Sequence, residues 1–318
     1  MPASDSFKNE FDAPWKASLE LFLAPFLSFC FPRVHALVDW SRPAVFLDTE
    51  LQQISPEHDE GGMAVDRLVR LSRRDGGEEW LLIHVEVQAQ AQPDREFAER
   101  MFLYWYRIRD RFGREAISLA VLADDRVAWK PERFQFEMGG CSLDFVFPVF
   151  KVIACEDAEA QFQADGNVFA LLIAAHQTAL ATRRNPEARY GARFRLIKYL
   201  YARGLARETV IGLFRIISWL TRLPQEMELR FRAELSRLER TEKSMAELLS
   251  PIELIAREEG REEGLRSGIV DALETRFGLA PEELRAKVAA IKDETALKKA
   301  LRAAWTSISL EQFRQQLS

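Results

Sequence analysis

Alternating apolar and polar residues predict two neighbouring strands in the first third of the chain. In the segment 80–88, the aliphatic residues at 81, 83, 85 and 87 share one face. The opposite face carries Trp80, Leu82, His84, Glu86 and Gln88. The segment 66–70 alternates in the same way, with Asp66, Leu68 and Arg70 on a common face. Asp75-Gly76-Gly77 lies between the two segments and favours a tight turn, so we expect an antiparallel hairpin.

The turn also determines which residues of this hairpin face each other. If Arg74 pairs with Glu78, the antiparallel register places Asp66 directly opposite Glu86. Opposed residues on neighbouring strands have Cβ atoms about 4.5–5.5 Å apart. Two carboxylates, the Gln88 amide and an imidazole are therefore expected to meet at one end of one sheet.

Helical periodicity predicts further elements before and after the hairpin. We expect a buried amphipathic helix over 15–31, a short strand or helix start over 45–51, and a helix over 96–111. The continuous apolar run 116–122 is typical of a central strand that is covered on both faces.

A second hairpin is predicted after the central strand. Segments 134–137 and 142–150 are joined across Gly139-Gly140, and we expect them to close the sheet as an antiparallel pair. These elements predict an α/β fold, with a mixed sheet flanked by helices and a core that ends near Val152.

The remainder of the chain is predicted to be helical. The pattern from 166 to 243 is helical throughout, with Gly204 as a stop signal. In 252–268, three glycines at intervals of four residues predict a weak helix, a hinge, or a face that another helix approaches closely, since each costs a helix about 1 kcal/mol relative to alanine. The predicted domains are an α/β core over 1–155, a helical extension over 156–250 and a small helical domain over 251–318.

Basic residues are concentrated in one part of the helical extension. Residues 183–207 contain eight of them against one acidic residue, Glu187. In a chain with a formal net charge of −5, this is the predicted phosphate-facing surface. The candidate DNA contacts within it are Arg189, Arg193 and Arg195. The alternative is a solvated helix face that pairs with the acidic tail.

Composition indicates the class of protein and its expected location in the cell. The charged fraction of 29% is that of an ordinary soluble protein, and the net charge argues against a protein that coats DNA nonspecifically. The three cysteines have no paired spacing, which suggests a reducing compartment and no zinc site. The apolar run 21–31 is interrupted by Pro25 and is shorter than the roughly 20 residues that a membrane span needs. We therefore expect no membrane association and a cytoplasmic location.

The paired carboxylates predict a cation site. Mg²⁺ prefers hard oxygen ligands, usually one or two carboxylates with waters and a substrate phosphate oxygen. Asp66 and Glu86 can hold one Mg²⁺ or Mn²⁺ between them, with the backbone carbonyl of Val87 as a third ligand and the Gln88 amide beside it. The simpler alternative is a charged cross-strand pair, satisfied by Arg67 or Arg70. No Walker-type phosphate loop, dinucleotide fingerprint or nucleophile elbow accompanies these residues.

The carboxylate, hairpin and Glu-x-Gln arrangement resembles the PD-(D/E)XK nuclease core. Within that superfamily, the chain resembles the recombination-promoting nuclease (Rpn), transposase-like family. The likeness runs from about Phe11 to the C-terminus. The segments that carry it are 47–51, 66–69, 83–88, 100–104, 174–176, 187–189, 258–264 and 276–278. The resemblance implies a PD-(D/E)XK restriction-endonuclease-like sheet, Mg²⁺ or Mn²⁺ as cofactor and DNA as substrate.

Roles for individual residues follow from this resemblance. It implies that Asp66 and Glu86 bind the metal, that Glu50 supports it as a third acidic group with Asp48 as a fallback, and that Gln88 orients the attacking water. It also implies that Arg100 and Tyr104, one helical turn apart, face the site and the DNA; the alternative is a core tyrosine and a surface arginine. Two departures stand out, because Val65 replaces the superfamily's proline and Gln88 replaces its usual lysine.

Three functions remain open from the sequence. The first is a metal-dependent DNA endonuclease linked to recombination or transposition. The second is a catalytically weak or inactive module of the same fold that binds DNA or protein. The third is an oligomeric scaffold, in which the C-terminal helices form contacts between copies of the chain.

Overall fold

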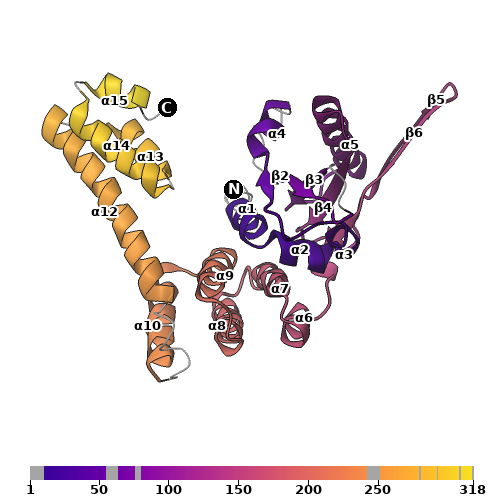
Figure 1. Ribbon diagram of the computed structural model, residues 1–318. Coiled ribbons are helices and arrows are strands. Elements are labelled where there is room, and N and C mark those ends of the chain that lie inside the picture. The colour runs from indigo at the N-terminus through magenta and orange to yellow at the C-terminus, as the bar shows by residue number, and fades with distance from the viewer. Residues whose placement is uncertain are drawn as a thin grey trace. The chain divides into compact units, whose positions relative to one another are not determined.

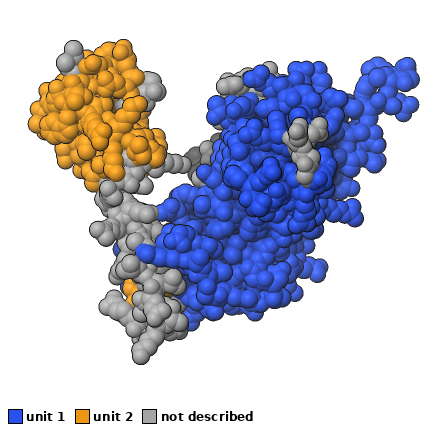
Figure 2. Space-filling view, viewed as in Figure 1, with its two compact units in different colours: residues 1–233 blue, residues 234–318 orange. Residues whose placement is uncertain are grey.

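The computed structural model describes residues 11–54, 64–75, 80–241, 251–278, 281–291, 293–307 and 309–316. The chain forms two compact units, residues 1–233 and 234–318 (Figure 2). The finer division into three domains, 1–155, 156–250 and 251–318, stays a prediction. None of the described helices is long and apolar enough to span a membrane.

A mixed five-stranded sheet lies at the centre of the first unit (Figure 1). The strand order is β1 (Val45–Phe46), β2 (Ala64–Ser72), β3 (Trp80–Gln88), β4 (Ala116–Leu122) and β7 (Val149–Lys151). The first three strands are antiparallel, whereas β3, β4 and β7 run parallel. The predicted α/β class with a mixed sheet is therefore confirmed, and β4 has the predicted bounds.

The register of the β2–β3 hairpin is also the predicted one, because Asp66 is paired with Glu86. The proposed contact between Arg74 and Glu78 lies partly outside the described residues. Burial of β3 is nearly complete on both faces, since it has strands on each side and helices above and below.

Helix α5 (Asp94–Phe112) connects β3 to the parallel strand β4 and covers one face of the sheet. Its first turn is acidic and its last turn is basic, as the helix dipole favours. It ends at Gly113, which takes a left-handed φ of 62°. Phe97, Met101, Tyr104 and Ile108 form its buried stripe. This stripe positions the polar residues of the same helix over β3.

The N-terminal helices differ from the sequence prediction. One helix was expected over 15–31, but the chain bends at Phe22 between α1 (Asp12–Leu21) and α2 (Leu23–Cys30). Pro25 lies in the first turn of α2, where a missing N–H breaks no helical hydrogen bond. Two short helices follow, α3 (Pro32–His35) and α4 (Asp48–Ile54).

The second predicted hairpin does not close the main sheet. Strands β5 (Arg133–Met138) and β6 (Cys141–Val146) form a separate two-stranded ribbon, which Figure 1 shows extending beyond α5. The expected single strand 142–150 is interrupted at Phe147-Pro148, and only β7 beyond the proline pairs with β4. Proline has no N–H for a ladder, which explains the interruption.

Helices complete the first unit. The 3₁₀ turn η2 (Val152–Ala154) leads to α6 (Ala158–Asp165), α7 (Val168–Ala181), α8 (Pro186–Ala202) and α9 (Arg207–Leu220). The next helix, α10 (Gln225–Thr241), contains the boundary between the two units, at residues 233 and 234. The predicted helical region is therefore confirmed. Gly204 follows α8 with a left-handed φ of 60°, as the predicted stop requires. The α7 helix packs against α2, α8 and α9 and is buried over most of its length.

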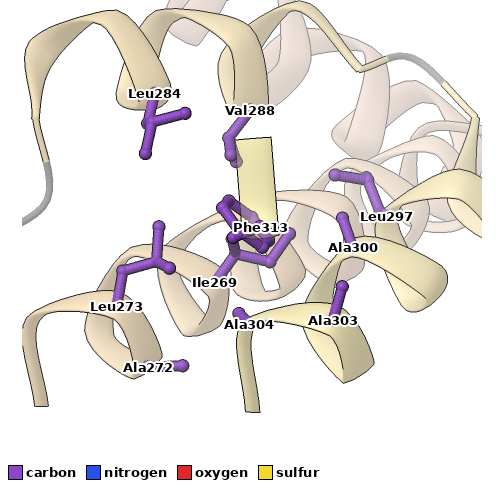
Figure 3. Packing of buried hydrophobic residues seen from close by; sticks show 10 residues of the cluster. All are labelled: Ile269, Ala272, Leu273, Leu284, Val288, Leu297, Ala300, Ala303, Ala304 and Phe313. Atoms are coloured by element: carbon purple, nitrogen blue, oxygen red, sulfur yellow. The ribbon is translucent and has the colours of Figure 1, made fainter. Parts of the chain in front are cut away.

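The second unit contains α12 (Pro251–Phe277), α13 (Glu282–Ala290), α14 (Glu294–Thr306) and α15 (Leu310–Gln316). Its core is aliphatic around Phe313 (Figure 3). The glycine-rich segment 252–268 lies within α12, which is a continuous helix. A Cβ at Gly268 would lie 3.6 Å from Leu301 Cδ1 of α14. Of the weak helix, the hinge and the closely approached face that the glycines predict, the closely approached face is therefore the one found at Gly268.

Candidate active site

A completely buried carboxylate is the central feature of the sheet. Glu86 lies on β3, between β2 and β4, on the face that α5 covers, and its side chain has no exposed surface. Burial of an ionised carboxylate is strongly unfavourable unless a charge or several donors compensate it. The surroundings of Glu86 must therefore provide that compensation.

Arg100 of α5 provides a positive charge. One guanidinium nitrogen, Nη2, donates to Glu86 Oε1 at 2.6 Å and to Gln88 Oε1 at 2.7 Å. The other, Nη1, donates to Gln92 Oε1 at 3.2 Å. The implied orientation of Arg100 toward the site is thus found, and the alternative of a surface arginine is wrong.

The Gln88 amide has a defined orientation. Its Nε2 donates to the backbone carbonyl of Gln90 at 2.9 Å, while its Oε1 accepts from Arg100. The backbone carbonyl of Gln88 accepts from Ala123 N at 2.8 Å, directly after β4. Both ends of this residue are therefore held in place before any ligand binds.

An imidazole and a phenol ring complete the buried group. His84 Nε2 lies 3.9 Å from Glu86 Oε2, and the His84 ring centroid is 4.7 Å from that of Tyr104. Both side chains are buried. Tyr104 belongs to an apolar cluster with Leu51 and Ile108, so it is a core residue that also borders the site.

The sequence predicts two further acidic residues beside Glu86, and the structure describes them to different extents. Asp66 is opposite Glu86 in the strand register, but its side chain lies outside the described residues. Glu50 is half-buried on α4, next to Leu51, which packs in the same cluster as Tyr104.

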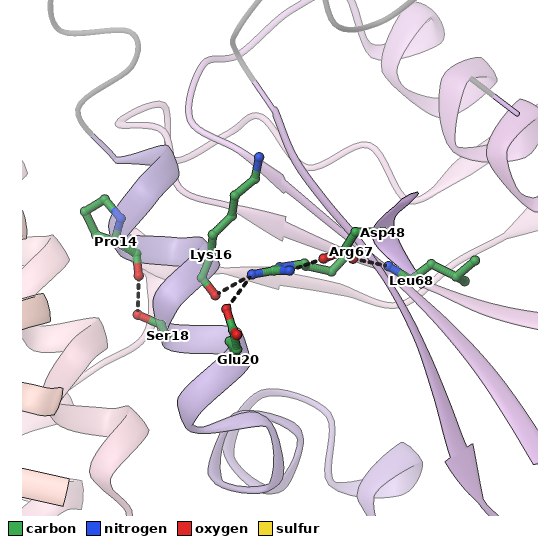
Figure 4. A network of polar contacts seen from close by, with 7 residues as sticks. All are labelled: Pro14, Lys16, Ser18, Glu20, Asp48, Arg67 and Leu68. Carbon is green, nitrogen blue, oxygen red and sulfur yellow. Dashed lines mark hydrogen bonds and ion pairs between the residues drawn. The ribbon is translucent and has the colours of Figure 1, made fainter. Parts of the chain in front are cut away.

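The fallback residue Asp48 serves the fold instead. It accepts from Leu68 N at 3.3 Å and pairs with Arg67, which also donates to Lys16 O and Glu20 Oε2, each at 3.2 Å (Figure 4). Arg67 points to the opposite face of β2 from Asp66, because neighbouring residues of a strand alternate. Asp48 therefore joins α4 to β2 and holds Arg67, which in turn contacts α1, so the fallback assignment is wrong.

The donor types at this site suit a hard divalent cation. Glu86 offers a carboxylate and Asp66 is its cross-strand neighbour, while the Val87 carbonyl as a third ligand stays a prediction. In the ladder, the Gln88 carbonyl points to β4, so the Val87 carbonyl points to β2. Among the side chains that the structure describes, which do not include Asp66, no group of three or more His, Cys, Asp and Glu has metal-binding geometry.

The predicted DNA contacts of the helical extension are mostly engaged within the fold. Arg193 is buried, donates to Glu228 Oε1 at 2.6 Å and to Ser218 Oγ at 2.8 Å, and stacks on Phe231. Burial lowers its pKa below the usual range. Arg193 does not reach the surface, and its assignment as a DNA contact is wrong.

Two further candidates have partners in the same unit. Arg195 forms two hydrogen bonds of 3.0 Å with Glu159, and these raise the pKa of its guanidinium. Arg189 donates to Arg222 O at 3.0 Å and to Thr182 Oγ1 at 3.2 Å. The carboxylates that pair with this region, such as Glu159 and Glu228, come from neighbouring helices of the first unit.

Sequence reasoning missed a buried ion pair at the carboxyl ends of the parallel strands. Lys151, the last residue of β7, pairs with Asp124 just after β4, and both side chains are almost fully buried. Lys151 also lies over the Trp129 ring, 5.2 Å from its centroid. An aspartate directly after an apolar strand is the signal that could have indicated this position.

His176 of α7 is buried against the same strand end. The Trp15 indole N–H donates to His176 Nδ1 at 3.3 Å, so Nε2 carries the proton and donates to Ala123 O at 2.8 Å. Burial lowers the pKa of His176 to about 4. This neutral imidazole connects α1 and α7 to Ala123, directly after β4. The N–H of Ala123 donates to the Gln88 carbonyl.

Comparisons of the chain with protein-family models, with curated proteins and with solved structures found no match. A fold alone does not determine a function.

Proposed function

We propose that this chain is a metal-dependent DNA endonuclease with a PD-(D/E)XK-type core, of the kind found in Rpn nucleases. The observation that carries the proposal is Glu86, a fully buried carboxylate on the central strand that faces Asp66 in the hairpin register. Gln88 follows on the same face, with its amide oriented by Arg100 and Gln90.

The strand topology supports the same assignment. An antiparallel hairpin carries the two acidic positions, and the crossover helix α5 leads to a parallel strand. Ligands of open α/β sheets bind beyond the carboxyl ends of parallel strands. Glu86 and Gln88 lie at that end of β3, in contact with Arg100, whose partly exposed side chain is where a phosphodiester would approach the site.

Each residue has a separate task in this proposal. Asp66, Glu86 and the Val87 carbonyl hold Mg²⁺ or Mn²⁺, while Glu50 supports the site from α4. The metal, when bound, lowers the pKa of a water and neutralises charge on the scissile phosphate. Gln88 orients the nucleophile through its amide. Arg100 and Tyr104 line the approach from α5, where a guanidinium suits a phosphate oxygen.

A second function is favoured by one observation. Arg100 already occupies Glu86 and Gln88, and a guanidinium is a cation that a carboxylate can retain permanently. The chain would then be an inactive module of this fold that binds DNA or a protein. The sequence also predicts contacts between copies of the chain through the C-terminal helices. These contacts stay a prediction, whichever of the two functions holds.

A plasmid-nicking assay tests the proposal. Supercoiled DNA is incubated with the full chain in Mg²⁺ or Mn²⁺, with EDTA as the blank. We expect metal-dependent nicking that falls at least about 100-fold in Glu86→Gln and Asp66→Asn, since each removes a ligand charge. Glu99→Gln, an exposed residue of α5, is the matched control and keeps activity.

Two results would change the assignment. Equal nicking by the wild type and both variants would exclude this site. Binding of the plasmid without any nicking, in every metal, would favour the inactive binding module.

A further inference from the structure

The contact between Arg100 and Glu86 has a consequence for cation binding. Arg100 Nη2 lies between Glu86 Oε1 and Gln88 Oε1, at 2.6 and 2.7 Å. The Glu86 side chain is completely buried, whereas 17% of the Arg100 side chain is exposed. The guanidinium thus enters from the solvent side of the carboxylate, along the direction from which a dissolved ion approaches.

A guanidinium and a divalent cation compete for the negative charge of the same carboxylate. Ligands bind a metal through lone pairs, and Nη2 uses a lone pair of Glu86 Oε1 in a charge-assisted hydrogen bond. Two cations next to a single buried carboxylate repel each other strongly where little water screens them. Both cannot occupy Glu86 Oε1 at full strength.

We propose that Arg100 is an internal counter-ion that a divalent metal must displace from Glu86. The inference rests on the proposed function, because it assumes that Glu86 is a metal ligand. Metal-free protein is stabilised by the Arg100–Glu86 pair, and metal binding breaks that pair. The affinity for metal is therefore lower than the carboxylates alone would provide.

Gln92 gives the displaced side chain a second anchor. Its Oε1 accepts from Arg100 Nη1 at 3.2 Å, eight residues earlier in the chain and beside the start of α5. Arg100 can release Nη2 from Glu86 while Nη1 keeps this bond. Displacement then needs a change in one side chain and leaves α5 in place.

Calorimetric titration of the full chain with Mn²⁺ at pH 8 tests this inference without any cleavage assay. A charge-assisted hydrogen bond contributes about 1.5–3 kcal/mol, so Arg100→Gln should bind Mn²⁺ at least about tenfold more tightly than the wild type. Arg95→Gln changes an exposed arginine of the same helix and should bind like the wild type. Glu86→Gln should show no binding at this site.

The outcomes separate this inference from the proposed function. If Arg100→Gln and the wild type bind Mn²⁺ equally, and Glu86→Gln does not bind, the metal site stands and displacement is wrong. If neither the wild type nor Arg100→Gln binds Mn²⁺, both the metal site and the displacement are wrong. Should Arg100→Gln fail to fold, Arg100→Met removes the charge but keeps a long, unbranched side chain on α5, and an unchanged Mn²⁺ affinity in that variant would equally overturn the inference.

Discussion

His176 shows how a single buried side chain sets a pH dependence. Its pKa is lowered from 6.5 to about 4 by burial, so the unfolded chain takes up a proton first as the pH falls. The stability that neutral His176 provides is complete above pH 6.5 and is lost progressively down to pH 4. The shift corresponds to about 3 kcal/mol.

His176→Gln tests this dependence, because glutamine can still donate to the Ala123 carbonyl but does not titrate. We expect the free energy of unfolding of the wild type to fall about 3 kcal/mol further than that of the variant between pH 7 and pH 4. Urea unfolding at a series of pH values measures both. Parallel curves for the two proteins would contradict a neutral, buried His176.

Individual site residues differ in how far the sequence predicts them. The opposition of Asp66 and Glu86 follows from the turn and the period of two, which are local properties. The contact of Arg100 with Glu86 depends on how α5 rotates over the sheet, and local periodicity does not determine that rotation. Arg193 was misassigned because a count of charges does not reveal that Glu228 and Phe231 cover it.

At the level of elements, the pairing of β4 with β7 depends on a buried charge pair. Lys151→Met would leave the Asp124 carboxylate buried without its ammonium, which typically costs about 3–5 kcal/mol. The double variant Asp124→Asn, Lys151→Met removes both charges, while the asparagine oxygen can still accept from Arg126 N, as Asp124 does at 2.7 Å. We expect it to recover most of the loss.

Thermal unfolding of the two single variants and the double variant forms a mutant cycle for this pair. Additive losses would show that Asp124 and Lys151 do not stabilise each other.

The basic surface between α7 and α8 carries a separate prediction. Arg184 is exposed and lines a cavity of about 500 Å³ with Asp125 and Gln177, whereas Arg183 beside it donates to Asp125 Oδ2 at 2.6 Å. If Arg184 contacts a phosphate, Arg184→Gln should reduce the slope of log affinity against log salt by about 0.9. Fluorescence anisotropy with labelled duplex DNA measures this slope.

Arg195→Gln is the matched control for Arg184→Gln, because Glu159 already binds that guanidinium. Its slope should equal that of the wild type. A lower slope in Arg195→Gln, with no change in Arg184→Gln, would move the DNA surface to α8.

Element boundaries were predictable where a chemical signal marks them. Gly204 and the alternation of β3 provide such signals, and both elements occur as expected. The break at Phe22 has such a signal too, because Pro25 has no N–H for the Leu21 carbonyl and its ring would clash with that carbonyl in a continuous helix. Pro148 could have indicated that 142–150 is not one strand.

On the scale of the whole molecule, the division into two compact units predicts that the first unit stays folded without the helices of the second. The first unit has its own sheet and helical core, and the core of the second unit is formed by α12 to α15. We expect Met1–Ser250 to be soluble and folded, and to nick plasmid DNA if the full chain does. Circular dichroism, mass and nicking of the purified fragment check this. Aggregation, or loss of nicking in a folded fragment, would show that α12 to α15 belong to the catalytic unit.

The most direct test is a crystal structure of the protein soaked with Mn²⁺, examined by anomalous scattering. We predict a Mn²⁺ peak in contact with the Glu86 and Asp66 carboxylates, with Arg100 Nη2 no longer bonded to Glu86. A crystal that takes up Mn²⁺ elsewhere, while Arg100 remains on Glu86 and Gln88, would contradict the metal site and with it the nuclease.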